Sequence, residues 1–469
     1  MPLGERVTAT LVVLVASFLA WSFGGVDRWS QLTAAGGALA ALVSALAPWR
    51  RSRAEPVTPL RRLARSPLAW CGLALFAYVV VQALNPSYRY ERDGSIWWLV
   101  PVPSVGWLPS AMSVPWTDAG PWRSLLPWFT AWALALAASL GLRRRRAVVG
   151  VLVALAANAF ALAAFGIVAR AAGGTTIYGL RAAPSSEPFA SFIYKNHAAA
   201  FLNLAWTLAL GLAVDAFVAN RRFPGRNRPV ILFFFFAGTI ALAVVLTGSL
   251  TGLAVLAGTA LLGLPVTVWW LATAGTALPR AAVYVALVLA LGLAGVGGAV
   301  TWIRLGEHLD ARLSGGGFES AQARWIAATR GVAMASDRWV FGWGAGCFRY
   351  GFTKYQRASP EITQQGPTRY FWEHVHDDWL ELAIELGAVG ALPLVAGLAS
   401  WLARVARLRP WRRPAQAWAL AGCASLAVTA AVDFPLQNPA VLAFAAVIAV
   451  LLVRWAESDD RRAGDPAVT

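Results

Sequence analysis

Twelve apolar runs of about 17 to 24 residues, nearly free of charge, dominate this chain. At 1.5 Å of rise per residue, a helix of that length crosses the roughly 30 Å of hydrocarbon in a bilayer. Only 13% of the 469 residues are charged, whereas a soluble protein carries about 25%. The sequence therefore predicts an all-α polytopic membrane protein with about 12 transmembrane helices, built as a single membrane domain over residues 1–469. The expected spans are 7–24, 31–48, 68–84, 124–141, 147–169, 198–219, 229–247, 252–274, 281–303, 379–401, 415–432 and 440–455.

The distribution of Lys and Arg predicts the orientation of these spans. Twelve spans put both termini on one side, whose loops hold 24 Lys and Arg against 7 on the other side, leaving out one long loop. Basic residues accumulate on the cytoplasmic side, so we expect both termini to be cytoplasmic. The first apolar run is interpreted as a retained span rather than a signal peptide. The net charge of +17 follows from the same bias, so no nucleic-acid partner is expected.

Two outward-facing loops are long enough to carry function. The smaller, residues 85–122, is rich in tryptophan and is expected to lie on lipid headgroups, where indole rings are favoured. The larger, residues 304–378, is expected to contain short helices. One of these is predicted on the outer face from apolar residues at helical spacing. They are Trp325, Ala328, Val332 and Ala335.

The same loop carries arginines on both sides of a glycine-rich turn at 342–346. Arginine stays charged and binds phosphate in a bidentate manner. Arg324, Arg330, Arg338 and Arg349 are therefore candidate anion ligands. The turn superficially resembles a nucleotide-binding loop, but no strand precedes it and nucleotides are not available outside the cytoplasm. A nucleotide site is therefore rejected.

Ionisable residues cluster where the large loop enters the next span. They are His374, His376, Asp377, Asp378, Glu381 and Glu385. The whole chain has only four histidines, and two of them are here. Because ionisable groups at the edge of a membrane span are costly, this cluster is a candidate functional site.

Three interpretations of the cluster are open from the residues alone. Asp377 and Asp378 can cap the helix, which explains neither histidine. The set offers ligand types that suit zinc, although adjacent positions point in different directions and no distant ligand completes the shell. His376 or His374 can act as a general base toward a sugar hydroxyl, with a neighbouring carboxylate holding the imidazole tautomer.

A second polar group lies at the outer mouth of another predicted span. It consists of Lys195, Asn196 and His197. A cation, an amide and an imidazole at a helix N-terminus make a candidate anion site. The alternative is that Lys195 only extends its amine to the membrane interface.

These segments together resemble the O-antigen ligase and O-antigen polymerase superfamily of bacterial membrane glycosyltransferases. The closing motif of that family is matched by His376, Asp377, nine further residues, Gly387, two residues and Gly390. Asp377 stands where Asn, Ser or Gln is more usual. Asn196-His197 is similar to the family's Asn-His-Phe-Ala signature.

Two further stretches, 324–348 and 433–439, are also similar to the family, so the resemblance covers roughly residues 185–455. One departure concerns phosphate binding. Many members carry an arginine where this chain has Leu250. The work of that arginine would therefore fall to Lys195 or to an arginine of the large loop.

The resemblance implies a C-type glycosyltransferase fold in the bacterial inner membrane, with the active face in the periplasm. It implies transfer of a glycan from an undecaprenyl-pyrophosphate donor to a hydroxyl of a lipid or glycan acceptor, as in lipopolysaccharide and cell-envelope polysaccharide synthesis. It implies inversion at the anomeric carbon, with no metal or other cofactor. The implied catalytic residues are His376, Asp377 and His374. The implied substrate-binding residues are Arg324, Lys195, Asn196, His197, Arg349, Gly387 and Gly390.

Two other functions are considered beside the ligase. A polymerase of O-antigen or exopolysaccharide chains in the same superfamily shares these motifs. A transporter of lipid-linked glycans is a more distant alternative, because transporters usually carry ionisable or broken-helix sites near the bilayer midplane. The predicted spans are nearly free of charge at mid-depth, and the polar groups gather at one face. This pattern favours surface chemistry over passage.

Overall fold

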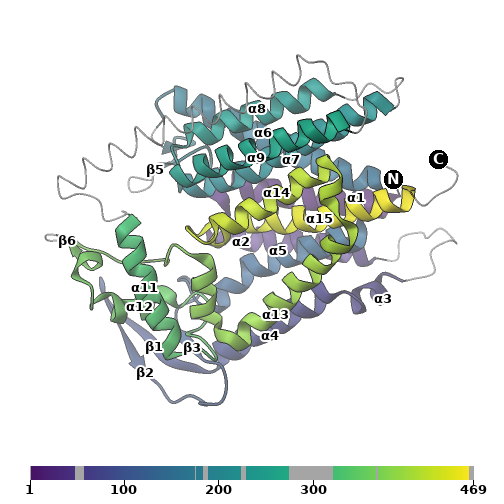
Figure 1. The fold of residues 1–469 in the computed structure, drawn as a ribbon. Helices are drawn as coiled ribbons and strands as arrows, with labels where there is room; N and C mark the ends of the chain where they lie inside the picture. Colours follow the sequence, from purple (N-terminus) through teal and green to yellow (C-terminus); the bar gives the residue numbers. More distant parts are fainter. Residues whose placement is uncertain are drawn as a thin grey trace.

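The computed structural model describes residues 2–47, 58–174, 176–182, 188–222, 229–273, 321–365 and 368–463. Within these ranges, nine helices are long and apolar enough to cross a membrane. They are α1 (Leu3–Trp21), α2 (Arg28–Leu46), α4 (Pro67–Leu84), α5 (Pro121–Gly141), α6 (Arg145–Ala171), α7 (Lys195–Arg222), α9 (Leu250–Thr273), α13 (Asp378–Leu408) and α15 (Pro439–Ala463). The shorter helices α8 (Val230–Leu246) and α14 (Pro414–Thr429) join the same bundle (Figure 1).

The prediction of an all-α polytopic membrane protein is confirmed. Eleven of the twelve expected spans coincide with helices, and the expected span 281–303 lies outside the described residues. The remaining elements are short and mostly lie between the spans. They are α3 (Pro59–Ala64), α11 (Ala321–Asp337), α12 (Phe348–Gln356), the strands β1 (Pro86–Asp93), β2 (Ile96–Pro101), β3 (Ala111–Ser113), β4 (Thr176–Ile177), β5 (Arg181–Ala182), β6 (Gln364–Gln365) and β7 (Thr368–Arg369), and the 3-10 helices Phe23–Gly25, Pro360–Ile362, Pro410–Arg412 and Pro435–Gln437.

The most enclosed span is α7, which packs closely on α14 through small residues. A Cβ atom at Gly211 of α7 would lie 2.5 Å from the carbonyl oxygen of Ala415. A Cβ at Gly422 of α14 would lie 2.2 Å from the hydroxyl of Thr207. Because lipid gives no hydrophobic drive for helices to associate, such close backbone contact is what holds neighbouring spans together.

Ion pairs join one end of the bundle, where α1 begins and α15 ends. Arg145 of α6 lies 2.5 Å from Asp215 of α7 and 2.7 Å from Asp459 of α15. The backbone amides of Arg143 and Arg144 donate to the Glu5 carboxylate of α1. The two terminal helices therefore meet at the same end, which is the end expected to face the cytoplasm.

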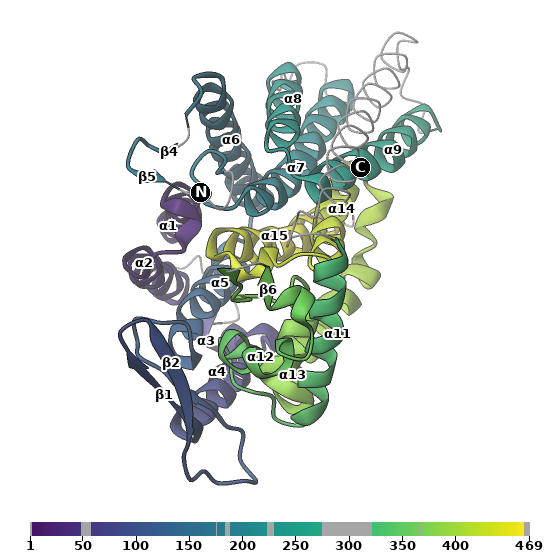
Figure 2. The same cartoon turned by 90° about the vertical axis from the view of Figure 1, so that its left-hand side faces the viewer.

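The opposite end carries the two long loops (Figure 2). Residues 85–122 contain a three-stranded sheet in the order β2-β1-β3, which the sequence interpretation did not predict. Strands β1 and β2 are antiparallel, with Tyr90 opposite Leu99. Trp97 is partly buried and packs edge-on against Tyr350 of α12.

The predicted helix of the large loop is present as α11, but its buried side differs from the apolar spacing noted in the sequence. Trp325 is 75% exposed and Val332 is 55% exposed. Ala323, Ala327 and Met334 are buried instead. Small side chains and one flexible methionine allow α11 to lie close against α13.

Two glycines connect the large loop to α13. Gly387 interrupts that helix with φ +63°, and a Cβ there would lie 2.5 Å from the backbone nitrogen of Gly342. Conversely, a Cβ at Gly342, which has φ +70°, would lie 2.3 Å from the Glu385 carbonyl oxygen. Only glycine allows both the backbone conformation and this approach.

Backbone hydrogen bonds hold the two segments together. The amides of Trp343 and Gly344 donate to the carbonyls of Ile384 and Glu385 at 2.8 and 2.9 Å. The amide of Ala388 donates to the carbonyl of Trp339 at 2.8 Å. From α4, the Gln82 side chain donates to the carbonyls of Phe341 and Glu385, each at 3.0 Å.

We expect Gly342→Ala to lower the free energy of unfolding by about 3 kcal/mol or more, because the new methyl group meets backbone atoms as well as a disfavoured conformation. Gly94→Ala is the matched control, since Gly94 also has positive φ but has no atom within 4 Å of its Cβ position. The control should cost about 1–2 kcal/mol from conformation alone. Thermal unfolding in detergent micelles compares the two, and equal losses would contradict the packing argument.

Candidate functional site

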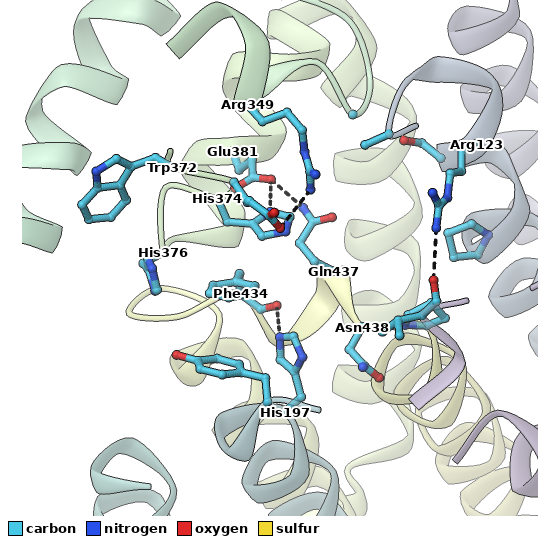
Figure 3. A pocket seen from close by; sticks show the side chains of 18 of the residues that line it. Arg123, His197, Arg349, Trp372, His374, His376, Glu381, Phe434, Gln437 and Asn438 are labelled. Carbon is cyan, nitrogen blue, oxygen red and sulfur yellow. Dashed lines mark hydrogen bonds and ion pairs between the residues drawn. The ribbon is translucent and has the colours of Figure 1, made fainter. Parts of the chain in front are cut away.

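A cavity of about 670 Å³ opens at the end of the bundle that carries α11, α12 and the sheet (Figure 3). It lies among the beginnings of α5 and α13, the residues just before and after the start of α7, and the turn between α14 and α15. Its polar lining residues include Gln31, Arg123, Tyr194, His197, Arg349, Glu373, His374, His376, Glu381, Glu385, Gln437 and Asn438.

One aromatic ring, that of Phe434, organises this lining. His374 stacks on it, with ring centroids 4.6 Å apart and planes at 21°. His376 and His197 meet it edge-on at 4.8 and 5.0 Å. Tyr194 stacks against it at 5.3 Å. Three of the four histidines of the chain therefore contact a single phenylalanine.

His374 is held by a buried carboxylate. Its Nδ1 lies 2.7 Å from the Glu381 carboxylate, which is 2% exposed. The same carboxylate accepts from the backbone amide of Val375 at 2.9 Å and from the side chain of Gln437 at 3.2 Å. A carboxylate with three donors fixes both its own position and the orientation of the imidazole.

His376 is paired with a different carboxylate. Its Nδ1 lies 3.4 Å from Asp433, which is 2% exposed at its side chain. Asn196 donates to the other oxygen of Asp433 at 2.6 Å. The backbone of His376 is left-handed, with φ +61°, a conformation that is uncommon outside glycine and concentrates at functional sites.

The charges around Asp433 favour its ionised form. Burial alone would raise the pKa of Asp433, but the His376 imidazole and the charges of Arg324 and His197 outweigh burial and lower the pKa below its ordinary 3.8. Arg324 therefore acts on Asp433. It does not line the cavity, where the sequence interpretation placed its contact with substrate.

The two aspartates after His376 have structural contacts. Asp377 is the N-cap of α13, and its side chain accepts from the amides of Trp379 and Leu380 at 3.0 Å. Asp378 is fully buried and accepts from the amide of Leu436 at 2.8 Å. The capping interpretation thus describes Asp377, while Asp378 holds the turn that positions Phe434.

Two arginines bring positive charge to the lining of the cavity. Arg349, at the start of α12, lies 3.5 Å from Glu373. Arg123, at the start of α5, donates to the carbonyls of Thr117 and Val26 at 2.8 and 3.1 Å and is close enough to feel the charges of Arg349 and Arg28. The sequence interpretation included Arg349 but missed Arg123, whose signal was a basic residue at the outer mouth of a span.

The other predicted substrate-binding residues are spread around the cavity. His197 lines it and contacts the carbonyl oxygen of Phe434 at 3.1 Å, while Asn196 lies behind it on Asp433. Lys195 begins α7 and is half-buried, outside the lining. Gly387 and Gly390 are packing positions, and a Cβ at Gly390 would lie 2.3 Å from the Tyr78 ring.

Comparison with protein families relates part of this site to a known family. Residues 231–395, about a third of the chain, match the family model described as O-antigen ligase. This segment is therefore similar to O-antigen ligases. The match confirms the resemblance and supports a membrane enzyme of the O-antigen ligase and polymerase type, acting in polysaccharide biosynthesis. No curated protein matches the chain.

The matched segment, residues 231–395, holds only part of the cavity. His374, His376, Glu381 and Arg349 lie inside the matched range. Arg123 and the segment around His197 lie before this range, and the segment around Phe434 lies after it. The site is therefore complete only when the flanking spans are folded around the matched segment.

The lowered pKa of Asp433 predicts a pH-dependent contribution to stability. An ionised Asp433 stabilises the fold fully above its ordinary pKa of 3.8, and the contribution is lost as pH falls through the lower folded value. Asp433→Asn should therefore lower the thermal unfolding midpoint at pH 6, and the difference from the unmodified protein should shrink below about pH 4. An undiminished difference at pH 3 would contradict this account.

Proposed function

We propose that this protein is a membrane glycosyltransferase of the ligase type. It transfers a glycan from undecaprenyl pyrophosphate to an acceptor hydroxyl at the periplasmic face of the bacterial inner membrane, with both termini in the cytoplasm. The observation that carries the proposal is the cavity itself, in which two carboxylate-paired histidines and two arginines line one space at the mouth of membrane spans.

His376 is the proposed general base. A neutral imidazole can take a proton near neutral pH, and the Asp433 carboxylate on its other nitrogen stabilises the imidazolium that forms. The Nδ1–Asp433 separation of 3.4 Å is long for a hydrogen bond. Catalytic hydrogen bonds often tighten only when substrate is bound, so this distance is compatible with the role.

His374 and Asp377 support this base in different ways. His374 shares the Phe434 ring with His376 and is fixed by Glu381, so it is proposed to orient the sugar hydroxyl rather than to take its proton. Asp377 is proposed to act through the backbone, by capping α13 and fixing the turn that carries His376.

The reaction transfers one glycosyl group and one proton. The acceptor oxygen attacks the anomeric carbon, and the bond from that carbon to the pyrophosphate oxygen breaks. The electron pair leaves with the pyrophosphate, and the hydroxyl proton passes to His376. In-line attack inverts the anomeric centre. The leaving group is already activated, so the step needs no nucleotide.

Arg123 and Arg349 are the proposed ligands of the pyrophosphate. Both line the cavity, with Arg349 on the side of Glu373 and His374, and guanidinium groups suit phosphate oxygens. They provide the positive charge that many family members supply with an arginine at the position of Leu250. Arg324 is proposed to keep Asp433 ionised beside His376, and Lys195 to add positive charge at the start of α7.

We expect His376→Ala to lower the rate of glycan transfer about 10²–10⁴-fold, which is the usual contribution of a general base. The assay follows transfer from a polyprenyl-pyrophosphate-linked glycan in reconstituted vesicles. Lys354→Ala is the control, since Lys354 lies on α12 at the same end of the bundle and is 73% exposed at its side chain. A folded His376→Ala variant with full activity would refute the assignment.

Arg123→Gln and Arg349→Gln should each raise the KM for the donor about tenfold or more, since each removes a charged hydrogen bond to phosphate. The KM for the acceptor should stay the same. Arg357→Gln is the matched control, because Arg357 is exposed near the end of α12. A rise in acceptor KM with unchanged donor KM would contradict the assignment.

Deletion of the gene distinguishes a ligase from a polymerase. A ligase deletion leaves chains of normal length that are not attached to their acceptor. A polymerase deletion instead leaves single repeat units on the acceptor, and that result would overturn the ligase proposal.

A further inference from the structure

A second hollow adjoins the cavity on the side of the three-stranded sheet. It measures about 270 Å³ and shares four lining residues with the cavity, which are Ala119, Arg123, Arg349 and Phe371. The rest of its lining comes from β1, β2, the turn before α5 and the start of α12. The two arginines and Phe371 therefore lie where the two hollows meet.

Aromatic rings form much of the lining of this second hollow. The rings of Tyr90 and Trp97 stack with centroids 5.7 Å apart and planes at 26°. Trp97 also meets Tyr350 and Phe371 edge-on at 5.7 and 5.9 Å. Each ring is held by a neighbouring ring, and Phe371 is still 43% exposed. The hollow therefore offers a fixed aromatic surface to a ligand.

Polar groups in the same lining are available for hydrogen bonds. Within the part of the chain that the structure describes, the Asp118 carboxylate and the Trp97 indole N–H have no hydrogen-bond partner, and neither group is closed off from solvent. Arg92 is exposed and donates through Nε to the carbonyl of Gly94 at 2.6 Å, which leaves its terminal nitrogens available. The hollow thus presents an acceptor and several donors beside its aromatic surface.

This combination of groups matches a sugar ring. A pyranose has faces of C–H groups that pack on aromatic rings, and an edge of hydroxyls that both donate and accept hydrogen bonds. A prenyl or acyl chain would instead cover the Asp118 carboxylate and the Arg92 guanidinium without giving them partners, which is costly. The lining therefore favours a carbohydrate over a lipid tail.

The position of the hollow assigns this sugar to the donor. Arg123 and Arg349, the proposed ligands of the pyrophosphate, line the hollow, whereas His374 and His376 do not. In-line attack brings the acceptor oxygen to the anomeric carbon from the side opposite the pyrophosphate, next to the base. A hollow that borders the pyrophosphate ligands and not the base is therefore on the donor's side of the reaction.

We propose that this hollow is a subsite for the donor glycan. It takes a sugar other than the one whose anomeric carbon reacts, because the reacting sugar lies beside His376 in the cavity. Trp97 and Phe371 pack on the face of the bound sugar, and Asp118 accepts hydrogen bonds from its hydroxyls. This inference rests on the proposed function, since it names how the glycan of that donor is recognised. The loop 85–122 thereby helps to select which donor is used.

The test measures binding of two probes to the full chain in lipid nanodiscs. One probe is undecaprenyl pyrophosphate with the complete glycan, isolated from the source cells, and the other carries only the first sugar. Microscale thermophoresis gives the Kd of each. The unmodified protein should bind the complete donor about tenfold more tightly, as expected from an aromatic contact and a hydrogen bond to a charged group.

Trp97→Ala should reduce this preference to about threefold or less, because it removes the aromatic face of the subsite. Asp118→Ala should do the same by removing the acceptor, and it keeps the test valid if Trp97→Ala does not fold. Asp118 also lies near Arg123. The ratio of the two Kd values cancels any effect of the variant on pyrophosphate binding, since both probes carry that group.

Trp98→Ala is the matched control and should keep the full preference. Trp98 follows Trp97 in β2, so its side chain points to the other face of the sheet. It is 43% exposed and lines neither hollow. Equal Kd values for the two probes in the unmodified protein would overturn the proposal, and so would an unchanged preference in Trp97→Ala and Asp118→Ala. An increase in acceptor KM with an unchanged preference would assign the hollow to the acceptor and also overturn it.

The readouts separate this proposal from the proposed function. Binding needs no acceptor and no transfer, so the preference can be measured in a protein without activity. If glycan is transferred but the two probes bind equally, the subsite fails and the glycosyltransferase stands. If the preference behaves as expected and no glycan is transferred, the glycosyltransferase proposal fails instead.

Discussion

The backbone contact between Gly342 and Gly387 is the constraint on which the site depends. It joins a loop of the outer layer to a membrane-spanning helix through hydrogen bonds that leave no room for a side chain. Arg349 follows Gly342 in the chain, and His374 and His376 lie just before α13, the helix that carries Gly387. The positions of Arg349 and of the two histidines are therefore fixed relative to each other, because backbone hydrogen bonds rather than flexible side chains hold the two segments together.

Buried carboxylates complete the site because they accept hydrogen bonds from buried N–H donors that would otherwise have no partner. Glu381 and Asp433 are each almost fully buried, and each accepts from a backbone amide and a side-chain donor. Such charges are tolerated only where donors surround them. The result is a rigid polar floor below an open cavity.

The sequence predicted the spans well because length and lack of charge are local properties. It also found His374 and His376, since ionisable residues at a span mouth stand out by themselves. The buried side of α11 was predicted wrongly from Trp325 and Val332, which are exposed. In a membrane protein, lipid is as apolar as the core, so the spacing of apolar residues does not tell which side of a helix is buried.

The features that the sequence did not predict depend, with one exception, on contacts between residues that are distant in the chain. No local pattern predicts that three histidines contact Phe434, because these partners are distant in sequence. The sheet was the exception. Tyr88 and Tyr90, then Trp97 and Leu99, alternate with polar or outward residues at period two and pack on the α12 layer, so a strand signal was present.

The ion pairs of Arg145 give the bundle a mechanical asymmetry. This guanidinium links α6, α7 and α15 at the end far from the cavity, and Glu5 links α1 to the same point. Separation of α6, α7 and α15 at this end would leave the carboxylates of Asp215 and Asp459 without the guanidinium that they share.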